Sequence, residues 1–122
     1  MPAGSAANHT GLRKKLFRIY NDVNKEIYAF GVVEIKINLT ADSITFIAKH
    51  NRVQALKVLE KRYVMLKQSV DYALFQEFKL LLKEKLIAEL GLEPEVILRD
   101  YETNSQIAFT VVFLKNNLSK VE

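Results

Sequence analysis

Three consecutive polar residues, His50, Asn51 and Arg52, are the most promising chemical feature of the chain. They follow a segment typical of a strand and precede one typical of a helix. The free N–H groups and the dipole at a helix N-terminus favour an anion. Arg52 can clamp a carboxylate or a similar small anion, and His50 can titrate near neutral pH. We therefore predict a site here that binds an anion or a partner. The alternative is that Asn51 only caps the helix while its neighbours are solvated.

A second candidate pair, Arg99 and Asp100, lies on the strand of the C-terminal half that partly matches the first site. These residues either supplement the site at His50 or form an ion pair with each other. The expected site therefore draws on both halves of the chain.

Conventional catalytic machinery is missing from the sequence. Nucleophilic catalysis needs a base within reach of an activated Ser, Thr or Cys. The only histidines are His9 and His50, and no serine elbow or acid partner for His50 can be recognised. There is no cysteine, no metal-binding pattern and no cluster among the four glycines. We expect no catalytic residues, no metal and no cofactor; a small-anion enzyme centred on His50 and Arg52 is the alternative.

The composition is that of an ordinary globular domain. The chain has 122 residues, of which 49% are hydrophobic and 26% charged, and its net charge is +4. No apolar run approaches the roughly 20 residues of a membrane-spanning helix. We expect a cytoplasmic protein, with a peripheral position at the inner face of the membrane as an option. Such a charge suits an acidic protein face, anionic lipid or nucleic acid, although a merely solvated surface explains it as well.

The first half of the chain predicts a helix followed by a β-hairpin. Apolar residues recur every three or four positions from Leu12 to Phe30, with Thr10 as a cap and Gly31 as a left-handed end. Residues 33–39 alternate between apolar and polar, which is typical of a half-buried strand. A polar turn at 40–43 leads into a second strand that ends near His50.

The second half predicts two helices and another hairpin. One apolar stripe comprises Leu56, Leu59, Tyr63 and Leu66; residues 67–69 interrupt it, and Ser69 is a good cap for a longer helix. Gly91 and Pro94 should end that helix. Two strands then flank the turn at 102–105. The apolar residues share one face on each strand: Val96 and Leu98 on the first, and Ile107, Phe109, Val111 and Phe113 on the second.

The predicted order is α-β-β-α-α-β-β, and the fold class is α+β. A lone hairpin is marginally stable, so the two hairpins should merge into one four-stranded, mainly antiparallel sheet with helices packed on one face. We place a disordered leader at 1–10, a single domain at 11–116 and a frayed tail at 117–122. Consecutive apolar residues, Val111 and Val112, put one apolar side chain on each face. We therefore predict a homodimer, formed edge to edge or through the exposed sheet face.

A nucleic-acid-binding protein is a further alternative. Within "LRKKLFRIY" the basic residues can reach phosphate groups, while Phe17 or Tyr20 can stack on a base. However, the apolar residues of this segment belong to the predicted core stripe, so the basic ones form its solvated side. The chain has neither the GxxG loop of a KH domain nor the aromatic motif of an RNA-recognition domain. Nucleic acid is therefore the less favoured partner.

Four segments together resemble the MpsC family of small bacterial proteins, also called the YbcI-like family and formerly a domain of unknown function. The resemblance spans about Leu12 to Leu114. Its segments are "LRKKLFRIYNDVNKEIYAFGV", "ITFIAKHNRVQALKVLEKRY", "SVDYALFQEFKLLLKEKL" and "ILRDYETNSQIAFTVVFL". Broader relatives carry Gly-x-Gly-Pro after the first helix, where this chain has Phe30-Gly31-Val32-Val33. That departure places the chain in a subgroup.

The resemblance implies a role beside a membrane-associated system that translocates cations and supports membrane potential or inorganic-carbon supply. In that system, the family is the small soluble accessory member, and no catalytic residues carry over from it. A non-catalytic interaction protein follows as the leading hypothesis. Its partner would be an acidic cytosolic face of a membrane protein complex, or anionic lipid headgroups.

Overall fold

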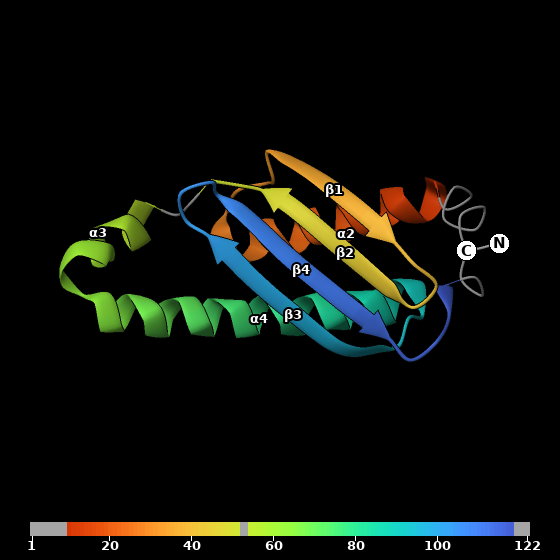
Figure 1. Cartoon of the computed structure of the whole chain (residues 1–122). Helices are drawn as coiled ribbons and strands as arrows, with labels where there is room; N and C mark the ends of the chain where they lie inside the picture. Colours follow the sequence, from red (N-terminus) through yellow and green to blue (C-terminus); the bar gives the residue numbers. More distant parts are fainter. Residues whose placement is uncertain (1–9, 52–53, 119–122) are drawn as a thin grey trace.

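The computed structural model describes residues 10–51 and 54–118. The predicted leader up to residue 9 and the predicted tail from residue 119 onwards lie outside the described residues, as do Arg52 and Val53. Seven elements follow one another along the chain (Figure 1). They are α2 (Thr10–Tyr28), β1 (Glu34–Leu39), β2 (Ser43–Lys49), α3 (Gln54–Arg62), α4 (Val64–Leu90), β3 (Pro94–Glu102) and β4 (Ile107–Leu114).

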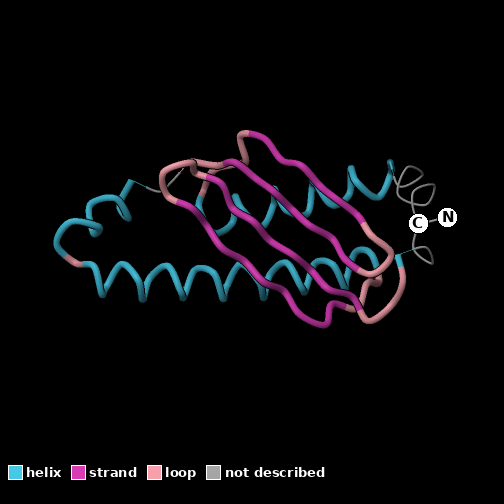
Figure 2. Tube along the Cα trace, in the orientation of Figure 1, coloured by secondary structure: helices cyan, strands magenta, loops and turns pink. Residues whose placement is uncertain are grey.

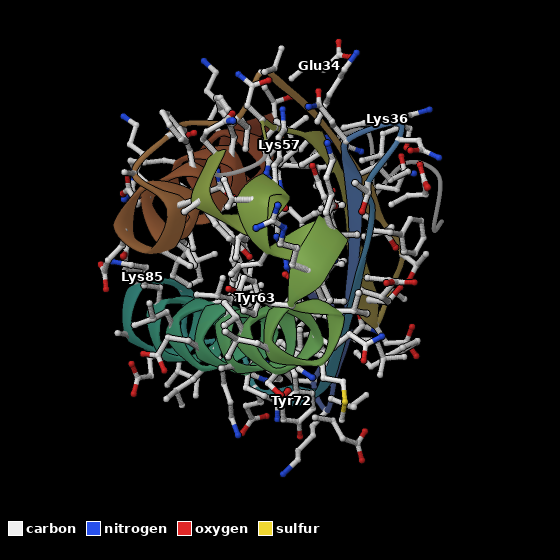
Figure 3. All side chains as sticks on the ribbon, turned by 90° about the vertical axis from the view of Figure 1, so that its left-hand side faces the viewer. Glu34, Lys36, Lys57, Tyr63, Tyr72 and Lys85 are labelled. Atoms are coloured by element: carbon white, nitrogen blue, oxygen red, sulfur yellow. The ribbon has the colours of Figure 1, made fainter. Side chains whose placement is uncertain are left out.

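The two hairpins form a single antiparallel sheet with the strand order β1-β2-β4-β3. Helices α2 and α4 run in opposite directions across one face of this sheet (Figures 1 and 2). The view along the strands shows two layers, with the sheet on one side and the helices on the other (Figure 3). The predicted α+β class, element order and one-sided helical cover are therefore confirmed.

The core lies between the sheet and the two long helices. The pairing of β2 with β4 places Phe46 opposite Thr110 and Ile44 opposite Val112, all four facing the helices. The apolar stripe of α2 meets them as predicted from Leu12 to Val23, but Phe30 lies beyond the helix and is 48% exposed. The ring of Tyr20 stacks on Phe46 with a centroid distance of 5.0 Å. The fully buried large side chains are Leu12, Leu16, Ile19, Tyr20, Val23, Ile44, Phe46, Phe78, Leu82, Leu86, Leu92 and Leu118.

The outer face of the sheet is unusually apolar. The row predicted from the sequence, Ile107, Phe109, Val111 and Phe113, does share one face of β4, but that face points away from the helices. The smaller residues of β4, such as Ala108 and Thr110, face the core instead. Val96 and Leu98 of β3 lie beside this row on the same outer face. The hydrophobic alternation thus predicts correctly which residues share a face of β4. The larger apolar set, however, lies on the outer face.

The long helix α4 ends as predicted, at Gly91. This glycine has a φ of 64°, and its N–H donates to the carbonyl of Ile87. The predicted left-handed end of the first helix at Gly31 is wrong, because Ala29 adopts that conformation with a φ of 67°. Gly31 instead allows a close approach: the Oδ1 atom of Asn21 accepts a hydrogen bond from the N–H of the next residue, Val32, at 2.9 Å.

Replacing Gly31 with Ala should lower the free energy of unfolding by about 1 kcal/mol, since the new Cβ and the Asn21 hydrogen bond compete for space. That Cβ would lie 3.0 Å from Asn21 Oδ1. In an Asn21→Ala background the clash disappears, and the same change should be neutral or slightly stabilising because alanine restricts the unfolded chain. Urea unfolding of the four proteins measures this coupling. Equal costs in both backgrounds would contradict the close-approach explanation.

The break between the last two helices lies earlier than predicted. Residues 67–69 continue α4 without interruption, and the chain bends at Tyr63, whose φ and ψ are −125° and 52°. An ion pair between Lys67 and Asp71, 2.6 Å apart, spans the predicted break and supports the helix there. The predicted stripe of α3 is also wrong in part: Leu56 is buried, but Tyr63 and Leu66 are exposed.

The start of the predicted tail is part of the domain. Leu118 is buried in the core, and its N–H donates to the carbonyl of Ala41 at 2.7 Å. The prediction of a frayed segment beginning at residue 117 is therefore wrong for Leu118. The reason is that the carbonyl groups of Ala41 and Asp42, in the turn between β1 and β2, accept the N–H groups of Leu118 and Leu114, which holds this segment against the sheet.

Candidate functional site

Two of the predicted site residues, His50 and Arg99, lie together at one end of the core. His50 follows β2, while Arg99 lies on β3 on the face toward the helices, in the same inward row as Ile97. The Nη2 atom of Arg99 lies 3.4 Å from the Nε2 atom of His50. Only 4% of the surface of His50 is exposed. We call these two residues and the side chains around them the Arg99 cluster.

The guanidinium of Arg99 is held by neutral groups. Its Nη1 atom donates to the hydroxyl of Tyr20 at 2.9 Å and to that of Thr110 at 2.8 Å. Its Cζ atom lies 3.6 Å from the centroid of the Phe78 ring, a cation–π contact. No ion pair joins Arg99 to a carboxylate within residues 10–51 and 54–118. The cation is thus stabilised by hydroxyl groups and a π-face.

The ring of His50 is stacked between two tyrosines. Tyr28, at the end of α2, lies 5.6 Å away between centroids, and Tyr101 of β3 lies 5.3 Å away. The hydroxyl of Tyr101 also donates to the backbone carbonyl of His50 at 3.4 Å. This stack ties the end of β2 to β3 and α2, which fixes the orientation of the imidazole.

The surroundings of His50 keep its imidazole neutral. Burial, followed by the positive charge of Arg99, lowers the pKa of His50 from 6.5 to about 4, while a backbone contact with Asn51 partly opposes this. Since Arg99 can only donate, Nε2 must accept, so Nδ1 carries the proton. Burial also raises the pKa of the Tyr28 phenol, although the charge of Arg99 counteracts it. At neutral pH the imidazole of His50 is therefore neutral, and the positive charge of the cluster is on Arg99.

This arrangement suits structural stabilisation better than acid–base chemistry. A general base works best with a pKa near the operating pH, and an imidazole with a pKa of about 4 binds protons weakly at neutral pH. The cavity beside His50 is about 20 Å³, room for one water molecule. It is lined by Tyr28, His50, Asn51, Leu56, Asp71, Phe75 and Tyr101. Its one carboxylate, Asp71, also disfavours a small anion.

The other predicted site residues are dispersed. Asn51 is exposed and borders the small cavity. Arg52 lies outside the described residues, and α3 begins at Gln54, so the predicted cap by Asn51 stays a prediction. Asp100 points to the outer face of the sheet, opposite to Arg99, and accepts a hydrogen bond from the N–H of Tyr101. Arg99 and Asp100 therefore do not form an ion pair with each other.

The sequence prediction missed the aromatic and hydroxyl partners of Arg99. Tyr20, Phe78 and Thr110 come from three different elements. The sequence pattern suggests only base stacking for Tyr20 and indicates no role at Arg99 for any of the three. One signal was available. Alternate side chains of a strand share a face, so Arg99 lies on the same face as Ile97 and Tyr101. A buried Ile97 therefore implies a buried Arg99. The apolar neighbours Val96 and Leu98 pointed to the opposite orientation.

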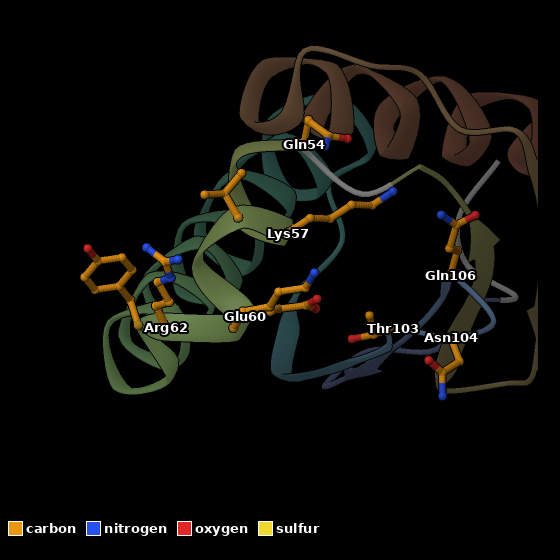
Figure 4. Close-up of a pocket in the computed structure, with 10 residues that line it drawn as sticks. Gln54, Lys57, Glu60, Arg62, Thr103, Asn104 and Gln106 are labelled. Atoms are coloured by element: carbon orange, nitrogen blue, oxygen red, sulfur yellow. The ribbon is translucent and has the colours of Figure 1, made fainter.

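A larger and more open cleft lies between α3 and the turn that joins β3 to β4 (Figure 4). Its volume is about 880 Å³. Lys57 extends across it toward Gln106, while Glu60 points toward Thr103 (Figure 4). Three basic residues, Lys57, Lys61 and Arg62, line the cleft against one carboxylate, that of Glu60. This cleft is positive and accessible, unlike the cavity at His50.

Neither a metal centre nor a membrane span is found in the described part of the chain. No group of three or more His, Cys, Asp or Glu side chains there is arranged to hold a metal ion. None of the helices in that part is both long and apolar enough to cross a membrane. The described surface thus offers a basic cleft and apolar patches as its main binding features.

Comparison with known proteins does not add a relative to this description. No family model, no curated protein and no solved structure matches the chain.

Proposed function

We propose that this protein acts by binding another protein and not by catalysis. Its binding surface is the arm formed by α3, Tyr63 and the first turns of α4, residues 54–72. The observation that carries the proposal is the length of α4. Its 27 residues span about 40 Å, whereas the nine residues of β3 span about 30 Å. The first turns of α4 therefore extend past the sheet, with α3 at their end (Figure 1).

The arm exposes apolar side chains that a two-layer core cannot cover. Met65 is 81% exposed, Tyr72 is 66% exposed, and Val64 and Leu66 are each about half exposed. Scattered apolar residues are normal on a protein surface, but a group at one helical corner marks an interaction site. Tyr63 adds an aromatic ring at the same corner, where Figure 3 shows it in front of α4. Such rings often anchor interfaces.

The charge of the arm selects the class of partner. Lys57, Lys61 and Arg62 line the cleft, so an acidic segment with apolar side chains complements this surface. The resemblance to the MpsC family suggests a more specific partner, the cytosolic face of a membrane-associated complex that translocates cations. In this proposal the protein is an accessory subunit, and the Arg99 cluster stabilises the scaffold that holds the arm.

The test is a matched pair of charge reversals. The variant Lys57→Glu/Lys61→Glu should lose a partner that co-purifies with the wild-type protein from its native cell. Lys14→Glu/Lys15→Glu changes the charge of exposed residues of α2 by the same amount and should retain it. Binding should then be reproduced with the purified partner, weaken with salt and weaken again on Met65→Glu. Equal binding by both variants, or a complex that nuclease treatment removes, would contradict the proposal.

A further inference from the structure

The outer face of the sheet carries an apolar patch that none of residues 10–51 and 54–118 covers. The patch consists of one whole row of β4 and its neighbours on β3 and β2. Phe109 and Phe113 are 47% and 41% exposed, and Leu98 is 56% exposed. A sheet with one solvated face normally alternates apolar side chains inward and polar ones outward. The members of this outer patch are Ile47, Val96, Leu98, Ile107, Phe109, Val111 and Phe113.

Charged residues flank the patch with opposite net sign on its two sides. Lys36 of β1 and Lys49 of β2 lie on one flank together with one carboxylate, that of Glu34, while Asp100 and Glu102 of β3 lie on the other. Because strand residues alternate between faces, the register places all five on the outer face with the patch. Figure 3 shows Lys36 extending from the upper part of the sheet, away from the helices. The face is therefore polarised from basic to acidic across an apolar centre.

This polarity fits a second copy of the same chain. In a face-to-face pair related by a two-fold axis along the strands between β2 and β4, β1 lies over β3 of the partner and β2 lies over β4 of the partner. Lys36 of one copy then lies over Asp100 of the other, and Phe109 packs against Ile47 of the other. Such an arrangement is self-complementary, as a two-fold interface requires. Two sheets packed in this way are also a common architecture, with strands about 30° apart.

The available area is sufficient for a stable dimer. Four strands about 4.8 Å apart, with about eight residues at about 3.3 Å each, give a face of about 500 Å² in projection. Two such faces bury at least about 1,000 Å², the lower range for specific interfaces. The aromatic and aliphatic centre with a charged rim also matches the usual anatomy of an interface.

We infer that the protein forms a homodimer through the outer faces of two sheets, with β2 and β4 at the centre. The inference does not depend on the proposed function, since the arm belongs to the helical layer on the other side of the sheet (Figure 1). A two-fold axis along the strands leaves both arms free at the same end of the dimer. One dimer would thus present two arms to a partner, which strengthens binding through effective concentration.

Sedimentation equilibrium of the full chain tests the inference. The wild-type protein should be dimeric at micromolar concentration, and Phe109→Lys/Phe113→Lys should raise the dissociation constant at least a hundredfold, because the dimer would bury two unpaired charges per copy. Tyr72→Lys places the same kind of charge on an exposed residue of the arm and should leave the dimer intact. A monomeric wild-type protein at several hundred micromolar, or a dimer that only the Tyr72 variant weakens, would overturn the inference.

A charge swap keeps the test decisive if the double lysine variant does not fold. Lys36→Asp and Asp100→Lys should each weaken the dimer, because each creates like charges across the axis. The combined variant should restore most of the lost affinity. Failure of the combination to recover any affinity would contradict the assigned geometry. Dimerisation and partner binding are measured separately, so loss of one without the other distinguishes this inference from the proposed function.

Discussion

Replacing Arg99 with Met should lower the free energy of unfolding by about 3 kcal/mol, because two charge-assisted hydrogen bonds and a cation–π contact are lost together. The guanidinium donates to Tyr20 and Thr110 at 2.9 and 2.8 Å and lies over Phe78. Both hydroxyl groups would remain buried without this donor. Urea unfolding at pH 7 measures the change.

The opposite outcome is physically reasonable and therefore informative. Burying a cation costs solvation energy, and replacing buried charged groups with apolar ones sometimes stabilises a protein. Arg99 has no carboxylate partner among residues 10–51 and 54–118, so the Met variant leaves no orphaned negative charge. If Arg99→Met unfolds at the same or a higher urea concentration, the cluster does not stabilise the fold, and a ligand-binding role for Arg99 gains support.

Two control variants separate charge from geometry. Arg99→Lys keeps the positive charge but not the planar fork, so it should fall between the wild type and the Met variant in stability. Phe78→Leu removes the π-face beneath the guanidinium while keeping an apolar side chain in the core. If the cation–π contact matters, Arg99→Met should cost less in the Phe78→Leu background than in the wild type.

The amphipathic pattern predicted most of the fold. The apolar period of α2, the two hairpins and the glycine that ends α4 are local signals, and neighbouring residues predict each of them correctly. The predicted joint between α3 and α4 is misplaced because Ser69, a good cap by residue type, lies inside α4. In the structure, the Lys67–Asp71 ion pair and continuous backbone hydrogen bonding extend the helix through it. Local propensity for a break was outweighed by these contacts.

The orientation of the C-terminal hairpin was harder to predict. Val96, Leu98 and the β4 row look like core residues, yet they face outward, while Arg99 and Thr110 face the helices. The helical side already holds Tyr20, Phe46 and Phe78, so at this end of the core β4 contributes only the small side chains of Ala108 and Thr110, and β3 contributes a flat guanidinium. Which side chains face the helices depends on contacts between segments that are distant in the chain. The apolar periodicity of the sequence does not reveal these contacts.

The candidate site was predicted in part for the same reason. The sequence indicates His50 as a polar residue between a strand and a helix, and Arg99 as a residue of the partly matching strand in the C-terminal half. They are 49 positions apart in the chain. Only the β2–β4–β3 register brings them together. Tyr28 and Tyr101 enclose His50 through that same register and through the end of α2. The chemical character of the site, neutral at His50 and cationic at Arg99, follows from burial that the sequence does not reveal.

The second large effect is a loss of stability in mild acid. The pKa of His50 is 6.5 in the unfolded reference and about 4 in the folded protein. Between these two pH values the unfolded chain therefore binds a proton at His50 and the folded chain does not. The contribution of His50 is therefore fully present above pH 6.5 and is lost as the pH falls toward 4. One pKa unit corresponds to about 1.4 kcal/mol, so unfolding should become easier by about 2 kcal/mol between pH 7 and pH 5.

The variant His50→Gln isolates this effect, because glutamine does not titrate but can still accept a hydrogen bond from Arg99. Its absolute stability is unimportant; the comparison concerns the slope of unfolding free energy against pH. Between pH 5 and 7 most carboxylates stay ionised in both proteins, so their contributions largely cancel. The slope should be steep for the wild type and nearly flat for the variant. Parallel slopes would mean that the folded state does not lower the pKa of His50, and the environment described for this imidazole between Tyr28 and Tyr101 would be contradicted.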